Sequence, residues 1–84
     1  MTKETIDELF NALKELNISE FVLDASKKTL DLKYKEDFDN FFPKFNGEPT
    51  TMNEDYGTPY GAGNIASFMY EEWTITGNIK EHKK

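Results

Sequence analysis

The chain of 84 residues contains no cysteine, and all ten of its basic residues are lysine, so arginine is absent as well. Without cysteine, neither a disulfide framework nor a thiolate metal site is possible. Arginine usually makes the bidentate contacts to phosphate and guanine, so we expect no direct binding to nucleic acid. The only histidine, His82, lies close to the end of the chain, where we expect no catalytic or ligand role.

Long apolar runs are also missing. No stretch approaches the roughly 20 consecutive apolar residues that a membrane helix needs, and the first residues lack the basic start and apolar run of a secretory signal. We therefore expect a cytoplasmic protein with no membrane contact. The length favours a single small acidic domain over 1–84, with a frayed basic tail at 80–84.

The first half of the chain has the hydrophobic patterns of a helix followed by a hairpin. Helical spacing predicts a helix over 3–16, ended by Asn17 in a left-handed conformation. Residues 20–24 and 29–35 read as strands and predict a hairpin over 20–35. The apolar stripe of the helix consists of Ile6, Leu9, Phe10, Leu13 and Leu16.

The second half has a less regular pattern. Phenylalanines at helical spacing before Pro43 predict a short helix near 36–42. Residues 46–64 hold four of the five glycines and two of the three prolines, which indicates a long loop. The pattern over 64–76 fits either helix or strand, and we expect helix or irregular structure at 64–71 and a third strand near 72–76. The predicted fold is α+β, with the N-terminal helix packed on a small antiparallel sheet.

Acidic and aromatic residues are concentrated in the middle of the chain. Residues 36–72 contain eight carboxylates and a single cation, Lys44, while the whole chain has a net charge of −6. The same stretch holds eight of the twelve aromatic residues. A negative field beside aromatic anchors suits docking onto a basic protein. The expected electrostatic contacts are Glu36, Asp37, Asp39, Glu48, Glu54, Asp55, Glu71 and Glu72, and the expected anchors are Tyr56 and Tyr60.

No motif for catalysis, a metal or a cofactor accompanies this charge. Glu71 and Glu72 are adjacent and diverge in a helix or a strand, and the glycines at 61 and 63 lack the flanking residues of a nucleotide site. We therefore expect no enzyme, no metal and no cofactor.

The leading hypothesis is a small acidic inhibitor that occupies the basic surface of a nucleic-acid-binding or nucleic-acid-cleaving protein. Phage proteins that act against a nuclease or CRISPR effector follow this logic, as do nuclease immunity proteins and antitoxins. The alternative is a structural or regulatory adaptor subunit, either a monomer or a homodimer formed through an exposed sheet edge, in which the acids are only solvated.

Overall fold

The computed structural model describes residues 2–52, 57–58, 61–62, 65–79 and 81–82. Helix α1 spans Thr2–Glu15 and is followed by Asn17 at a positive φ of 58°. The hairpin strands are β1 (Phe21–Asp24) and β2 (Thr29–Leu32). Helix α2 (Lys35–Phe41) leads into the 3-10 helix η1 (Phe42–Phe45). The remaining strands are β3 (Thr50–Met52), β4 (Gly57–Thr58), β5 (Gly61–Ala62), β6 (Ile65–Tyr70) and β7 (Trp73–Asn78).

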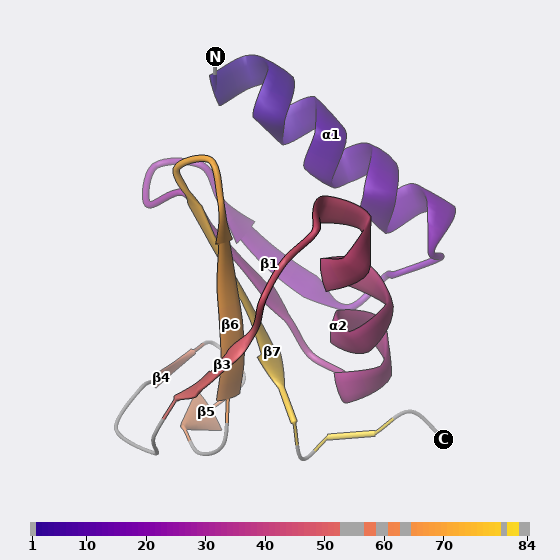
Figure 1. Ribbon diagram of the computed structural model, residues 1–84, viewed down its shortest axis with the longest axis vertical. Coiled ribbons are helices and arrows are strands. Elements are labelled where there is room, and N and C mark those ends of the chain that lie inside the picture. The colour runs from indigo at the N-terminus through magenta and orange to yellow at the C-terminus, as the bar shows by residue number, and fades with distance from the viewer. Residues whose placement is uncertain (1, 53–56, 59–60, 63–64, 80, 83–84) are drawn as a thin grey trace.

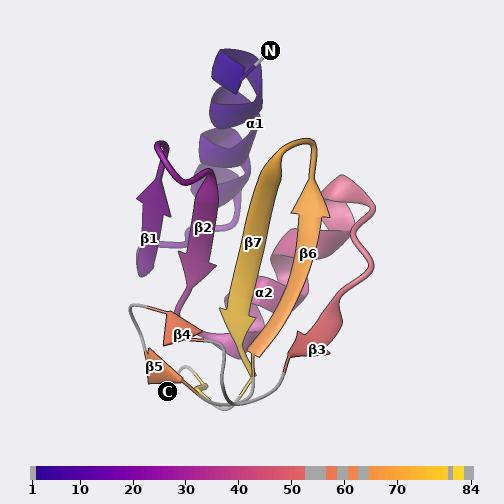
Figure 2. The same ribbon diagram turned by 90° about the vertical axis from the view of Figure 1, so that its left-hand side faces the viewer.

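Five strands form one sheet in the order β1-β2-β7-β6-β3, and β4 pairs with β5 in a separate hairpin. Both helices lie on one face of the sheet, as Figure 1 shows. Figure 2 shows the opposite face, with β7 in the centre and the helices behind it. The architecture is therefore the predicted α+β class, with two layers.

Two details differ from the prediction. The sheet is mixed, because β2 and β7 run parallel, with Thr29 opposite Thr74 and Leu32 opposite Gly77. Parallel neighbours need a crossover, and the chain makes it through α2 after leaving β2. The second difference is that part of the loop predicted over 46–64 forms strand β3 and the β4–β5 hairpin.

Residues 65–70 form strand β6, so the expectation of helix or irregular structure over 64–71 is wrong. Ala66 and Phe68 face the helices, while Ile65 and Met69 lie on the other face. Because both faces carry apolar side chains, the alternation of apolar and polar residues that marks a strand is lost. Pairing with β7 on one side and β3 on the other stabilises the strand.

The core lies between the helices and the sheet and is rich in phenylalanine. Phe41 is fully buried, with its ring centroid 5.0 Å from that of Phe45 and 6.4 Å from that of Phe68. Phe10, which the sequence places in the apolar stripe of α1, is instead 46% exposed. The stripe of α1 that reaches the core is centred on Leu9, Ala12 and Leu13.

The face of the sheet away from the helices carries polar side chains. Asp31, Thr76 and Ser67 are neighbours in register on β2, β7 and β6, and all three are buried. The Thr76 hydroxyl donates a hydrogen bond to the Asp31 carboxylate. Burial raises the pKa of Asp31 above its usual 3.8, and the hydrogen bond only partly opposes this. Ionised Asp31 therefore lowers the stability of the fold at neutral pH.

We expect Asp31→Asn to be more stable than the wild type by up to about 1 kcal/mol at pH 7. Folded Asp31 keeps its proton to a higher pH than unfolded Asp31, so wild-type stability falls as pH rises from 3.8 through the folded pKa. Asparagine does not ionise, so the variant does not lose stability in this way, and its side-chain oxygen can still accept the hydrogen bond from the Thr76 hydroxyl. Thermal unfolding of both proteins from about pH 4 to pH 7 tests this. The gap in midpoint should widen as pH rises, and a constant gap would contradict the expectation.

Candidate functional site

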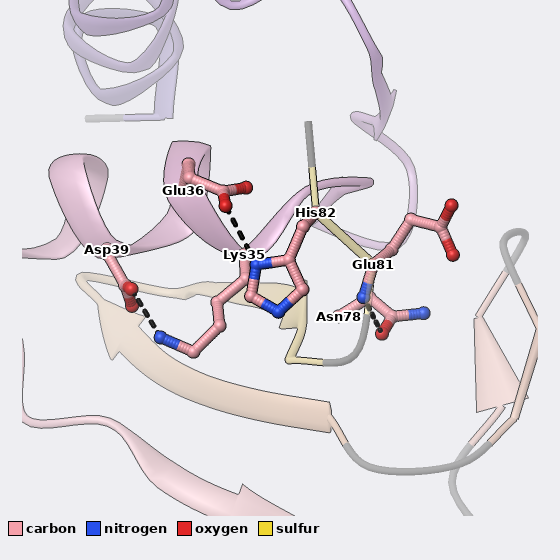
Figure 3. A network of polar contacts seen from close by, with 6 residues as sticks. All are labelled: Lys35, Glu36, Asp39, Asn78, Glu81 and His82. Carbon is pink, nitrogen blue, oxygen red and sulfur yellow. Dashed lines mark hydrogen bonds and ion pairs between the residues drawn. The ribbon is translucent and has the colours of Figure 1, made fainter. Parts of the chain in front are cut away.

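The first turn of α2 and the C-terminal segment together present a group of exposed charges, drawn in Figure 3. His82 Nδ1 lies 2.7 Å from Glu36 Oε2, and Lys35 Nζ lies 2.6 Å from Asp39 Oδ2. The hydrogen bond that Lys35 donates to the Asp39 carboxylate raises the pKa of Lys35. We call Glu36, Asp39 and the exposed Glu81 the α2 acidic surface. Among the described side chains drawn there, three carboxylates stand against one lysine, Lys35.

One backbone hydrogen bond holds the C-terminal segment against the start of α2, and a second bond ties that segment to the end of β7. The amide of Lys35 donates to the carbonyl of Glu81 at 2.8 Å. The amide of Glu81 donates to Asn78 Oδ1 at 3.2 Å, just after β7 ends. The first of these bonds explains how the Glu81 backbone, distant in sequence from α2, comes to lie beside Lys35 at the start of α2. Residues 80, 83 and 84 of the predicted frayed tail lie outside the described part of the chain.

Asp37 does not belong to this exposed surface. The side chain is only 3% exposed, because positions 37, 38 and 41 are the buried side of α2. The prediction that Asp37 contacts a partner electrostatically is therefore corrected. A carboxylate in the first turn favours the helix N-terminus, so its place in the structure is consistent with a structural role.

Glu71 and Glu72 lie at the other end of the molecule. They form the turn between β6 and β7, which Figure 1 shows at the top of the sheet, whereas α2 begins near the bottom. Glu71 has a positive φ of 57°, and both residues are exposed. Lys28, from the β1–β2 turn, forms an ion pair with Glu72.

The remaining predicted contacts do not complete one continuous region. Glu48 is exposed between η1 and β3. Glu54, Asp55, Tyr56 and Tyr60 lie outside the described residues. Among the acids that the structure does describe, those on α2 and those at the β6–β7 turn are separate, so acids that are concentrated in the sequence do not form a single region in space.

Two exposed acids that sequence reasoning passed over lie outside the 36–72 stretch. Glu81 joins the α2 acidic surface, and Glu20 precedes the outer strand β1. Nothing in the local sequence distinguishes either from an ordinary solvated residue. Their positions depend on which strand is outermost and on where the chain returns after β7.

The described side chains offer little chemistry besides charge. Within the described ranges, no three His, Cys, Asp or Glu side chains gather closely enough to hold a metal ion. The helices in that part of the chain are too short or too polar to cross a membrane. Comparison of the chain with protein-family models, with curated protein sequences and with solved structures finds no match.

Proposed function

We propose that this protein is a small cytoplasmic inhibitor that binds a basic surface of another protein, with the α2 acidic surface as its docking point. The preferred target is a protein that holds or cleaves nucleic acid, because its groove for phosphates would also accept carboxylates. Phage anti-defence proteins and nuclease immunity proteins are two classes of inhibitor that could act through such binding. The proposal rests chiefly on one observation, the solvent-accessible carboxylates of Glu36, Asp39 and Glu81 where α2 meets the C-terminal segment.

Charge pairing on the rest of the surface supports the proposal. Lys28 and Lys44 each form an ion pair with a carboxylate. These pairs neutralise two of the ten lysines that could repel a basic partner. The net charge of −6 thus acts at long range as a negative field, which speeds association with a basic surface.

The α2 acidic surface also has a favourable architecture for recognition. Glu36 and Asp39 are half-exposed, and each is oriented by a polar contact with a neighbouring side chain, His82 and Lys35 respectively. Fixing a side chain before binding reduces the entropy lost on association. A basic partner would therefore meet carboxylates that already have a defined position.

The test begins with capture of partners from the native host and their identification by mass. Binding of the captured protein is then measured with the double variant Asp39→Lys, Glu81→Lys. Because two attractive charges become repulsive at the contact, we expect dissociation to be at least about fivefold faster. Association of the wild type should slow by about tenfold between low and high salt.

The matched control is the double variant Asp7→Lys, Glu71→Lys, which makes the same charge change on α1 and at the β6–β7 turn. It should slow association through the weaker field but leave dissociation within about twofold of the wild type. Equal acceleration of dissociation in both variants would show that the α2 acidic surface is not the contact. Association that does not depend on salt would contradict a basic partner altogether.

A further inference from the structure

Strand β1 is the outermost strand at one side of the sheet, and no described residue pairs with its outer edge. Two backbone bonds show which of its groups point outward. The Lys33 amide donates to the Glu20 carbonyl at 3.3 Å, so residue 20 directs its backbone towards β2, as do residues 22 and 24 by alternation. The Thr74 amide donates to the Lys28 carbonyl at 3.0 Å, so residue 28 directs its backbone towards β7. By alternation, residues 29 and 31 direct theirs towards β1, which agrees with the first bond. The outward N–H and C=O groups therefore belong to Phe21 and Leu23.

The side chains along this edge have a defined charge pattern. Glu20, Val22 and Asp24 lie on the sheet face away from the helices, and Val22 is 37% exposed. A carboxylate thus flanks an apolar side chain on each side. The hydrogen bond from the Ser26 hydroxyl lowers the pKa of Asp24, so this residue stays charged at neutral pH. Phe21 and Leu23 face the opposite way and pack against the core.

Phe10 adds an apolar group on the helix side of the same edge. Glu8 bonds to a side chain of β6, and Glu15 bonds to one of η1, so this flank of α1 faces those elements. At about 100° per residue, Phe10 lies roughly 200° around the helix from Glu8. It therefore points to the other flank of α1, towards β1.

We propose that the outer edge of β1 is a docking site for an extended basic segment of another protein, which adds to the sheet as a further strand. Backbone groups of Phe21 and Leu23 supply the hydrogen bonds, as in other cases of strand addition. The side chains select a segment with the pattern basic, apolar, apolar, apolar, basic. Its central residue meets Val22, and its outer residues meet Glu20 and Asp24. The pattern reads the same in both directions, so it suits a parallel or an antiparallel segment.

A second copy of the chain fits this edge poorly in the register that uses all the outward groups of β1. Antiparallel pairing of two β1 strands that uses all the outward groups places Val22 opposite itself and each Glu20 opposite an Asp24 of the other copy. Two pairs of like charges would then face each other directly, which is destabilising. If the pairing shifts towards the β1–β2 turn, hydrogen bonds are lost, because residues 25–28 form that turn and do not continue the strand. Charge complementarity therefore favours a basic segment.

This docking site is separate from the α2 acidic surface and would stand even if that surface had no partner. The probe is the capped peptide Lys-Ile-Val-Ile-Lys, compared with Glu-Ile-Val-Ile-Glu, added to the isotope-labelled protein. We expect the basic peptide to shift the amide resonances of Phe21 and Leu23 and to slow their hydrogen exchange. The acidic peptide should have little effect on either.

Two variants make the test specific. Glu20→Lys should weaken binding of the basic peptide by up to about tenfold, because an attractive cross-strand pair becomes repulsive. Val22→Ser should also weaken it, through loss of the apolar contact, and it leaves the charge of the edge unchanged. Glu48→Lys, an equal change of charge elsewhere, should stay within about twofold of the wild type.

Three results would overturn the proposal. One is equal binding of the two peptides, and another is an equal effect of Glu20→Lys and Glu48→Lys. The third is a wild-type dimer whose Phe21 and Leu23 amides are already protected before any peptide is added, which would assign the edge to a second copy. If peptide binding succeeds but no basic protein is captured from the host, the proposed function fails while the docking site remains.

Discussion

Replacing Gly77 by alanine is expected to destabilise the protein by about 3 kcal/mol, a large part of the 5–15 kcal/mol that holds a typical domain together. A Cβ at this position in β7 would lie 2.3 Å from Phe38 Cγ and 2.4 Å from Phe38 Cβ. Phe38 cannot easily give way, because its ring is buried beneath α2 near the rings of Phe42 and Phe68. Denaturant unfolding, followed by the fluorescence of the only tryptophan, Trp73, measures the loss.

A second substitution separates this clash from other effects of alanine in a strand. Phe38→Ala removes Cγ and the rest of the ring, which include two of the three atoms nearest to the new methyl group. The pair Gly77→Ala, Phe38→Ala should therefore lose less stability than the sum of the two single changes, with a coupling of about 1 kcal/mol or more. A single Gly77→Ala variant within about 0.5 kcal/mol of the wild type would show that β7 and α2 can move apart.

Phe41→Ala is expected to cost about 3–5 kcal/mol, because it leaves a cavity among packed aromatic rings. Phe41 is fully buried and contacts the rings of Phe45 and Phe68. Phe10→Ala removes the same ring from an exposed position on α1, so its cost should stay below about 1 kcal/mol. Both variants are compared with the wild type by the same denaturant titration.

The relative costs of Phe10→Ala and Phe41→Ala can contradict the burial of these two residues in the structure. If Phe10→Ala costs as much as Phe41→Ala, then Phe10 is part of the core in solution, as the helical spacing alone suggests. Comparable small costs for both would mean instead that the aromatic cluster can collapse around the lost ring. A large loss for Phe41 alone would support the burial that the structure shows.

Local patterns predicted most of the elements, because each depends on neighbouring residues. The α1 stripe, the β1–β2 hairpin and the short helix before Pro43 follow from spacing within a few positions. Helix α1 is found at Thr2–Glu15 against a prediction of 3–16, and α2 at Lys35–Phe41 against 36–42. The class of the fold follows from these elements.

Long-range features were beyond such reasoning. The parallel pairing of β2 with β7 joins residues far apart in sequence. The hydrophobic periodicity of a strand does not indicate which other strand it pairs with. Strand β6 carries apolar residues on both faces and so resembles a helix in pattern. The exposure of Phe10 depends on how α1 rotates onto the sheet, which its own sequence does not determine.

The candidate site was predictable only in part. Clustering in sequence drew attention to Glu36 and Asp39, which lie on the exposed side of α2. It also grouped them with Asp37, which faces the core, and with Glu71 and Glu72, which lie at the far end of the sheet. Glu20 and Glu81 gain their interest from the tertiary structure, because one lies at a free strand edge and the other returns beside α2.

The central position of β7 has a consequence for the order in which the protein can form during synthesis. Strand β2 receives its second partner only when Thr74 and the residues after it are available. Until then, the nascent hairpin has two free edges, and the aromatic residues of α2 lack the surface that later covers them. Because the closing contacts span much of the chain, we expect folding to be slow for a domain of this size and to complete only after β7 leaves the ribosome.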